Sequence, residues 1–388
     1  MIILGIETSC DETAISVVQA EGGLEDLRFK VLGSAVHSQI DIHREYGGVF
    51  PTLAKREHIK NLPIVLEEAL KKAGFDELRI SLSADEVENY ELWKKENKNK
   101  KFPIDLITVT VGPGLEPALW TGIKFGEKLG KSWGIPVMPT NHMVGHIVSV
   151  LGTENYESRI PPDRVILAGK NQESDHRKIE WPAIALLISG GHTELVAMNS
   201  WIDKKKIGET QDDAVGEAFD KVARMLGLPY PGGPEISRLA SQVQKDNEHL
   251  EIRFPRPMMH SKDYNFSFSG LKTAVLYYLK ANPDADKVLV AKEFQDAIVE
   301  TLLFKTKKAI IEYAPKTLIV GGGVIANKEL REKFCDLERD FDSLRVLIPE
   351  KELTTDNATM ISMAGYIDYM SGDTKIPAKL QARGHLEI

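Results

Sequence analysis

Runs of apolar residues separated by short polar turns predict strands at two similar places in the chain. Residues 2–18 form an apolar run, a polar turn that carries acidic residues, and a second apolar run rich in Ala, Ile and Val. Residues 181–198 repeat this plan, with a strand to Ile188, a turn at residues 189–192 and a strand from Thr193. Two hairpins of the same plan indicate a duplicated domain.

The segments after the first hairpin alternate between helical and strand patterns. We predict a helix at about residues 53–73, a buried strand at 104–111 and a helix at about 115–133. This order is typical of α/β folds. With 388 residues, 42% of them apolar, the chain can bury two cores. We therefore expect α/β domains at residues 1–150 and 151–388, with the final helix packing back on the first.

Two polar, charged stretches interrupt this pattern, at residues 78–101 and 153–180. Their weak periodicity predicts surface insertions. The first ends in "KKENKNKK", which fits either a solvated loop or a patch that contacts RNA.

Composition narrows the class of protein. Cys10 and Cys335 are the only cysteines, too few for a disulfide scaffold or a cysteine-rich zinc module. No apolar run approaches the roughly 20 residues of a membrane helix, and the first residues do not resemble a signal peptide. We therefore expect a cytoplasmic protein. The net charge of -8 argues against binding nucleic acid over the whole surface, although a local basic face is compatible with it.

His142 and His146 lie four residues apart where a helix is predicted to begin. This spacing places both imidazoles on one helix face, as a shared metal ion requires. The best candidate for a third ligand is Asp356, just before the final helix; the alternative is that Asp356 caps this helix. Two imidazoles and a carboxylate suit zinc or ferrous iron and leave coordination positions open.

Glycine-rich turns near predicted strands form a second group of candidates, at residues 111–117, 189–192, 230–235 and 320–330. Glycines let backbone N–H groups approach a phosphate closely, and four such turns favour a nucleotide site. None has the dinucleotide-binding or P-loop spacing. Asp220, on a helix predicted at residues 212–227, could accept ribose hydroxyls while Gly233 lets the sugar lie close; otherwise it is a solvated acid.

Seven motifs occur in order along almost the whole chain: "GIETSCDET", "NHMVGHI", "LLISGGHTEL", "DDAVGEAFDKVARMLGLPYPGGP", "FSFSGLKTA", "GGGVIAN" and "TTDNATM". On these motifs the chain resembles the tRNA N6-adenosine threonylcarbamoyltransferases of the bacterial TsaD type, formerly labelled O-sialoglycoprotein endopeptidases. The resemblance implies a duplicated actin-like ATPase fold, related to ribonuclease H, with two similar domains around a nucleotide cleft.

The resemblance also implies roles for individual residues. His142, His146 and Asp356 would hold one divalent metal ion per chain, Fe2+ or Zn2+, and Glu12 would lie beside the reaction centre. The residues expected to contact the adenylate are Leu187, Ile188, Ser189, Gly190, Gly191, Asp220, Gly233 and Asn327.

The implied reaction is transfer of a threonylcarbamoyl group from L-threonylcarbamoyl-AMP to N6 of the adenosine 3′ to the anticodon (position 37) in ANN-decoding tRNAs. The implied partners are a TsaB-like paralogue and a TsaE-like ATPase, with a TsaC-type enzyme supplying the adenylate. Three positions depart from the family pattern: Thr52, Ser237 and Thr354. Ser237 removes one expected ribose contact.

Three other functions would account for part of the sequence. A metalloprotease of the H-E-x-x-H type needs glutamate directly after the first histidine, where this chain has Met143. A small-molecule kinase of the actin-like fold would use the glycine loops but not the two histidines and Asp356. A non-catalytic scaffold would not need these three residues intact.

Overall fold

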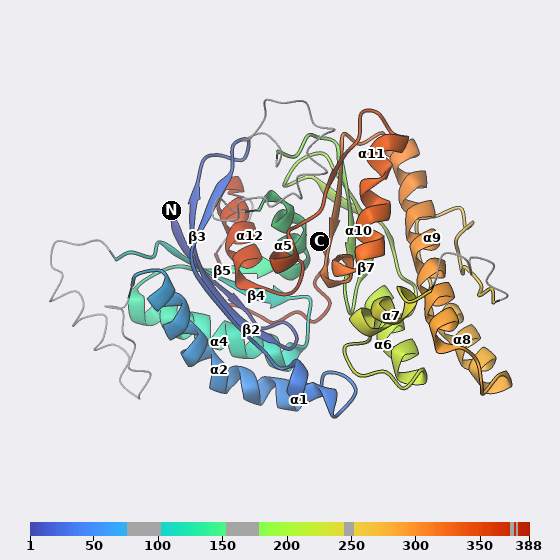
Figure 1. The fold of residues 1–388 in the computed structure, drawn as a ribbon. Helices are drawn as coiled ribbons and strands as arrows, with labels where there is room; N and C mark the ends of the chain where they lie inside the picture. Colours follow the sequence, from blue (N-terminus) through green and yellow to red (C-terminus); the bar gives the residue numbers. More distant parts are fainter. Residues whose placement is uncertain (76–101, 153–177, 244–251, 373–375, 378) are drawn as a thin grey trace. The chain divides into compact units, whose positions relative to one another are not determined.

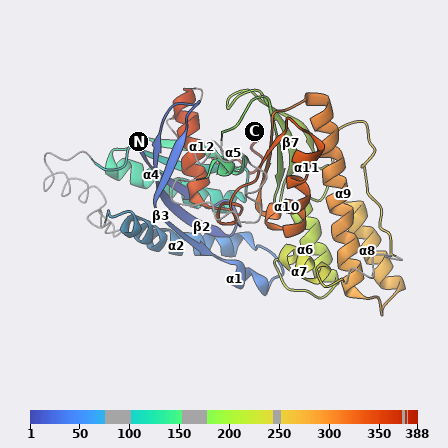
Figure 2. The ribbon, with the colours of Figure 1, turned by 45° about the horizontal axis from the view of Figure 1, so that its top comes forward.

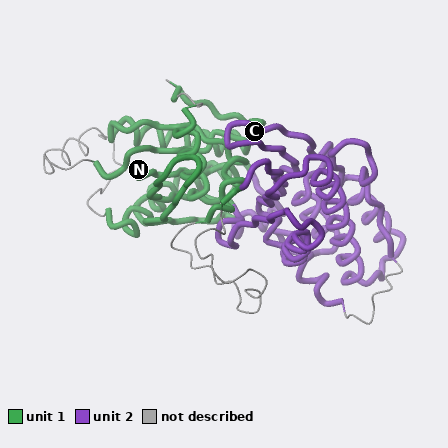
Figure 3. The backbone as a smooth tube through the Cα atoms, turned by 90° about the horizontal axis from the view of Figure 1, so that it is seen from above, with its two compact units in different colours: residues 1–39, 51–179, 356–387 green, residues 40–50, 180–355, 388 purple. Residues whose placement is uncertain are grey.

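The computed structural model describes residues 1–75, 102–152, 178–243, 252–372, 376–377 and 379–388. They form two compact units (Figure 3). Unit 1 comprises Met1–Gln39, Pro51–Ile179 and Asp356–Glu387, and unit 2 comprises Ile40–Phe50, Glu180–Thr355 and Ile388. The expected boundary was residue 150, whereas the units divide between residues 179 and 180. The predicted insertion at 78–101 and residues 153–177 of the other lie outside the described residues.

Unit 1 is built on a five-stranded sheet of order β3-β2-β1-β4-β5 (Figure 1). The first three strands are antiparallel neighbours, while β1, β4 and β5 run parallel. The bounds are β1 Ile2–Glu7, β2 Glu12–Glu21, β3 Arg28–Ser38, β4 Leu106–Gly112 and β5 Val137–Asn141. The predicted first hairpin and the buried strand after it are confirmed.

Unit 2 has a second sheet with the same plan, in the order β10-β9-β6-β7-β8. Again three strands are antiparallel neighbours and three run parallel. The bounds are β6 Ala183–Ile188, β7 Thr193–Met198, β8 Lys204–Glu209, β9 Thr317–Gly321 and β10 Arg345–Leu347. The predicted duplication is therefore confirmed by strand order and by strand direction.

The helices of unit 1 cover both faces of its sheet, with α2 and α4 on one side and α5 and α12 on the other (Figures 1 and 2). Their bounds are α2 Pro51–Lys72, α4 Glu116–Trp133, α5 His142–Val148 and α12 Ala358–Ser371. Gly5 lets α12 lie close to the sheet, since a Cβ there would come within 2.4 Å of the Ala358 carbonyl oxygen. The approach of α12 brings residue 356 to the end of β1.

The helices of unit 2 enclose a core that includes Phe219, Phe294 and Leu318. Their bounds are α1 Ile40–Arg44, α6 Val215–Met225, α7 Gly232–Ala240, α8 Ser269–Ala281, α9 Lys287–Tyr313, α10 Lys328–Cys335 and α11 Leu337–Asp340. The prediction that a helix begins at residue 212 was wrong. Asp212 precedes α6 and accepts hydrogen bonds at the start of α8, from Phe268 N at 2.8 Å and the Ser269 hydroxyl at 2.6 Å.

Among the described residues, none of the helices combines the length and the apolar character that crossing a membrane requires. Neither Cys10 nor Cys335 forms a disulfide bond.

Candidate functional site

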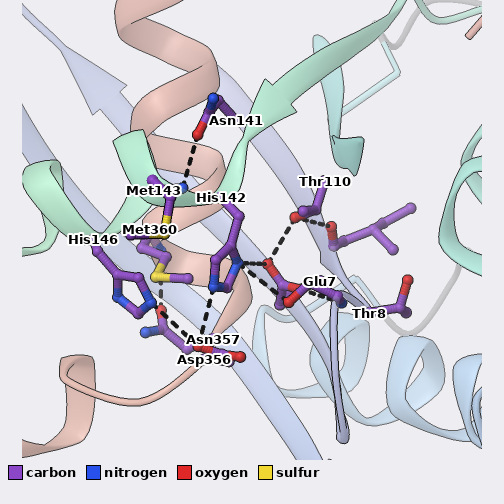
Figure 4. A network of polar contacts seen from close by, with 12 residues as sticks. Glu7, Thr8, Thr110, Asn141, His142, Met143, His146, Asp356, Asn357 and Met360 are labelled. Carbon is purple, nitrogen blue, oxygen red and sulfur yellow. Dashed lines mark hydrogen bonds and ion pairs between the residues drawn. The ribbon is translucent and has the colours of Figure 1, made fainter. Parts of the chain in front are cut away.

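His142, His146 and Asp356 converge in unit 1 (Figure 4). His142 is the first residue of α5, His146 lies one turn later, and Asp356 stands just before α12, which packs on α5. One potential ligand atom from each residue lies within 4.8 Å of the others. The Nε2 atoms of both imidazoles are 3.3 Å from Asp356 Oδ1. The structure thus brings together the three residues that the sequence proposed as ligands.

Caps fix the two helices that carry these residues. The Asn141 side chain accepts hydrogen bonds from Met143 N at 2.8 Å and Val144 N at 3.2 Å, which satisfies the first turn of α5. The cap of α12 is Asn357, whose side chain accepts from Met360 N at 2.9 Å. The alternative role of Asp356 as the cap of the final helix is therefore not observed.

Glu7, at the end of β1, orients the first imidazole. Its Oε2 lies 2.9 Å from His142 Nδ1 and also accepts a hydrogen bond from Thr110 Oγ1 at 2.7 Å. A carboxylate at Nδ1 holds a proton on that atom, which leaves Nε2, on the side of Asp356, as the nitrogen that could bind a metal. Sequence reasoning missed Glu7. The available signal was an acidic residue at the end of a wholly apolar strand, in "GIETSC".

His146 provides an independent test of whether a metal fits. Its side chain is fully buried, and neither ring nitrogen has a hydrogen-bond partner among the described residues. The 3.3 Å approach of Nε2 to Asp356 therefore brings the two atoms together without hydrogen-bond geometry. Buried polar atoms are rarely left unpaired, because desolvating them is unfavourable. A divalent cation shared by the three residues would satisfy this nitrogen, so the donor set fits a metal.

The protein environment polarises these groups. Burial lowers the pKa of His142, but the nearby carboxylates of Asp356 and Glu7 outweigh it and raise that pKa well above its ordinary value. Burial lowers the pKa of His146. Burial alone would raise the pKa of Asp356, yet the two imidazoles hold it below its usual range. The centre thus favours an ionised carboxylate.

Glu12 begins β2 in the same unit. Burial raises the pKa of its carboxyl group well above the ordinary value, and the charges of Asp11 and Asp356 raise it further. This response to Asp356 shows that Glu12 lies within electrostatic reach of the candidate ligands. Its role beside the reaction centre stays a prediction.

The glycine turns of unit 2 leave open space above the backbone. A Cβ added at Gly190, Gly191, Gly233 or Gly323 would meet no atom within 4 Å. Local packing therefore does not require glycine at these four positions, and their backbone is accessible to a ligand. Leu187 and Ile188 are fully buried in β6, so only their backbone could face one. Ser189 closes the turn after β6, since its N donates to His192 O at 2.8 Å.

Asp220 and Asn327 are both tied into the fold of unit 2. Asp220 Oδ1 accepts from Gly232 N at 2.7 Å, at the start of α7. The Asn327 side chain caps α10, accepting from Glu329 N at 3.0 Å, and donates to Gln295 Oε1 at 2.8 Å. Asn327 thus orders the loop after β9, which leaves fewer of its side-chain atoms for a ligand than the sequence suggested.

The turn at residues 111–117 has a structural explanation instead. A Cβ at Gly112 would lie 2.0 Å from Arg383 O, and one at Gly114 would lie 2.7 Å from Ser9 O. Arg383 N also donates to Val111 O at 2.8 Å. These glycines make room for the C-terminal segment and for Ser9, so their presence in this turn is no longer evidence for a phosphate site.

The repeated sheet and the helices that cover it define the actin-like ATPase class of fold. A crystal structure of HypF from T. kodakarensis superimposes with a TM-score of 0.53 at 11% identity, covering 96% of this chain and 47% of that one. At this identity the likeness concerns the fold alone.

Sequence relatives identify the family. The model of the TsaD family, tRNA N6-adenosine threonylcarbamoyltransferase, matches residues 30–82, 91–174 and 164–363. The protein of that name from Thermosipho africanus is 43% identical over 390 residues, covering 100% of both chains. Its namesake from Persephonella marina is 39% identical over 100% of this chain and 96% of its own. The chain belongs to the TsaD family, as its motifs indicated.

Proposed function

We propose that the protein transfers the threonylcarbamoyl group from L-threonylcarbamoyl-AMP to N6 of adenosine 37 in ANN-decoding tRNAs, with release of AMP. The observation that carries this proposal is the convergence of His142, His146 and Asp356. Their potential ligand atoms lie close together, and the buried Nε2 of His146 has no hydrogen-bond partner among the described residues. Family membership supports the same reaction, because the relatives carry the name of this transferase.

One Fe2+ or Zn2+ ion would be held by His142, His146 and Asp356. When bound, it supplies a Lewis acid for the carbamoyl carbonyl, at coordination positions that three protein ligands leave open. Glu7 contributes by fixing the tautomer and the direction of the His142 ring.

The adenylate end of the donor would lie on the open glycines of unit 2. The backbone N–H groups of Gly190 and Gly191, and that of Gly233 at the start of α7, suit its phosphate. A carboxylate oxygen has two lone pairs, so Asp220 can accept a ribose hydroxyl and keep its bond to Gly232 N. Gly233 leaves room for the sugar.

Transfer forms a bond between N6 of the adenosine and the carbamoyl carbon, breaks the bond from that carbon to the phosphate oxygen, and releases AMP. An aromatic amine is a weak nucleophile, so holding it in line with the donor supplies much of the acceleration. Glu12 would take the proton that the amine loses. Burial raises the pKa of Glu12 above its ordinary value, which makes its ionised carboxylate a stronger base.

We further propose cytoplasmic partners of the kinds found in this family: a TsaB-like paralogue, a TsaE-like ATPase and a TsaC-type enzyme upstream. The net charge of -8 supports shared RNA binding, since the acidic excess of the chain as a whole repels phosphates. The protein alone should bind tRNA weakly and with a steep dependence on salt concentration.

The deciding experiment separates the metal ligand from the ribose contact. Asp356→Ala should lose metal and transfer while keeping affinity for AMP, and Asp220→Ala should lose adenylate affinity while keeping the metal. Transfer is measured with partners present, beside peptide hydrolysis and sugar phosphorylation.

Asp336→Ala, an exposed substitution on unit 2, is the matched control. A protease would depend on the metal and ignore Asp220, whereas a kinase would do the opposite. Absence of transfer by the metal-loaded wild type with its partners, or full transfer by either test variant, would overturn the assignment.

A further inference from the structure

The segment of residues 40–50 belongs to unit 2 (Figure 3) and carries two exposed aromatic residues, Tyr46 and Phe50. Tyr46 and Phe50 stack with ring centroids 5.8 Å apart and an interplanar angle of 23°. They are nevertheless 60% and 52% exposed. A stacked pair that stays this exposed contributes little to the core of its own unit.

The loop that carries this pair is held in place from below by His43, which is fully buried. The His43 carbonyl accepts hydrogen bonds from Tyr46 N at 3.0 Å and Gly48 N at 3.4 Å, and its Nδ1 accepts from Phe50 N at 3.3 Å. Gly47 supplies a φ of 64°, which an L-residue rarely adopts. The rings are therefore presented by an ordered loop.

Two arginines flank the pair. Arg224 donates a hydrogen bond to the Gly47 carbonyl, and Arg44 Nε donates to Tyr230 O at 3.1 Å. Arg44 also pairs with the exposed Asp41 at 3.1 Å. Each guanidinium has five N–H donors and is exposed, so donors remain for phosphate oxygens.

Parallel aromatic rings beside arginines match the chemistry of unpaired RNA, whose bases stack on aromatic side chains while arginines bind its phosphates. A protein partner typically needs about 800 Å² on each side, and two such rings bury at most about 150–250 Å² each. We propose that Tyr46 and Phe50 form a platform on which bases of the substrate's anticodon loop stack. This inference rests on the proposed function for its RNA.

The test measures binding of a labelled anticodon stem-loop RNA to the full-length protein by fluorescence anisotropy. Tyr46→Ala and Phe50→Ala should each weaken binding about tenfold, because one stacked base is lost. Tyr46→Leu and Phe50→Leu keep apolar area without a π-face and should weaken it similarly. Tyr277→Ala is the matched control, since Tyr277 is 65% exposed on α8 of the same unit. An RNA duplex of equal length should bind all variants alike.

Steady-state transfer adds a second measurement. The KM for tRNA should rise in the alanine variants, while metal content and the KM for the adenylate stay unchanged. If the wild type performs no transfer yet stem-loop binding depends on both rings, the proposed function fails and the platform stands. Unchanged stem-loop binding in both alanine variants overturns the platform. So does full affinity in the leucine variants, or a change of oligomeric state without a change in RNA binding.

Discussion

Gly232 and Gly233 are adjacent at the start of α7, but the structure gives a different physical reason for glycine at each position. A Cβ at Gly232 would come within 2.5 Å of Ala223 Cβ and 2.8 Å of Phe219 O, whereas one at Gly233 would meet nothing within 4 Å. Gly232 is therefore needed for the packing of α7 on α6. Gly233 is available for a ligand.

Alanine substitutions should separate these two roles. Gly232→Ala should lower the free energy of unfolding by about 1–3 kcal/mol, because the extra methyl group has no room. Gly233→Ala should leave the fold intact, since alanine is a better helix former, but should weaken binding of an adenylate analogue. Urea denaturation and calorimetric titration measure the two effects. Equal loss of stability in both variants would contradict the distinction.

Glu7 gives a prediction about the metal. Glu7→Gln keeps the shape of the side chain but weakens the hydrogen bond to His142 Nδ1, so metal affinity should fall about 10- to 100-fold. Competition with a chelator of known affinity measures this change. Glu68→Gln is the control, because Glu68 pairs with a surface histidine, His37, at 3.2 Å. Equal metal affinity in the two variants would show that Glu7 does not orient a ligand.

Spacing alone predicted part of the candidate site. His142 and His146 are four residues apart, so one helical turn determines their relation whatever the rest of the fold does. Asp356 meets these histidines because α12 packs against α5, and Glu7 meets His142 through a contact that spans 135 residues of sequence. Local periodicity carries no record of that contact, so Glu7 was missed.

At the scale of elements, the central strands were predictable and the edge strands were not. β4 and β6 are buried along their entire lengths; β6 is a continuous apolar run, and only two threonines interrupt the apolar residues of β4. β8, with the sequence KKKIGE, lies at the edge of its sheet, where lysines are common and the apolar pattern is lost. The start of α6 was also predicted wrongly, because Asp212 was assigned to this helix, whereas its side chain accepts hydrogen bonds at the start of α8.

Asp212 makes the stability of unit 2 depend on pH. Burial raises its pKa, but hydrogen bonds from the hydroxyls of Ser267 and Ser269 and from backbone N–H groups outweigh this and hold the pKa below its ordinary value. A lowered folded-state pKa gives stability that is complete above the unfolded-state pKa, about 3.9. This stability is lost as the pH falls through the folded-state pKa.

Asp212→Asn should therefore lower the free energy of unfolding by about 1–2 kcal/mol at pH 7. The difference from wild type should shrink on acidification below about pH 4, as the wild-type carboxylate is protonated. Urea denaturation at pH 7 and below about pH 4 measures this difference in the free energy of unfolding. The control is Asp284→Asn, at an exposed position. A difference that stays constant with pH would mean that the charge of Asp212 is not what stabilises α8.

At the scale of the whole molecule, each unit has its own sheet and core. Ile6, Val109 and Leu66 belong to the core of unit 1, and Phe219 and Phe294 to that of unit 2. The boundaries were not predictable from the sequence, because the chain passes between the units repeatedly. Residues 40–50 belong to unit 2, although the segments on both sides of them belong to unit 1. Residues 356–387 belong to unit 1, although the segment before them belongs to unit 2. Hydrophobic patterns identify elements but do not reveal which elements share a core.

Separate cores and separate candidate sites lead to a prediction about metal removal. The proposed metal ligands all lie in unit 1 and the proposed adenylate contacts in unit 2, and a ligand stabilises the unit that binds it. Trp181 and Trp201 belong to unit 2, so replacing them and Trp93 with phenylalanine leaves Trp120 and Trp133, whose fluorescence reports on unit 1. In a second variant, phenylalanine replaces every tryptophan outside unit 2. The fluorescence of Trp181 and Trp201 then reports on unit 2. Chelation should lower the unfolding midpoint in the first variant, and AMP should raise it in the second. Equal shifts in both variants for each ligand would mean that the two units unfold as one, since domains with their own cores otherwise unfold separately.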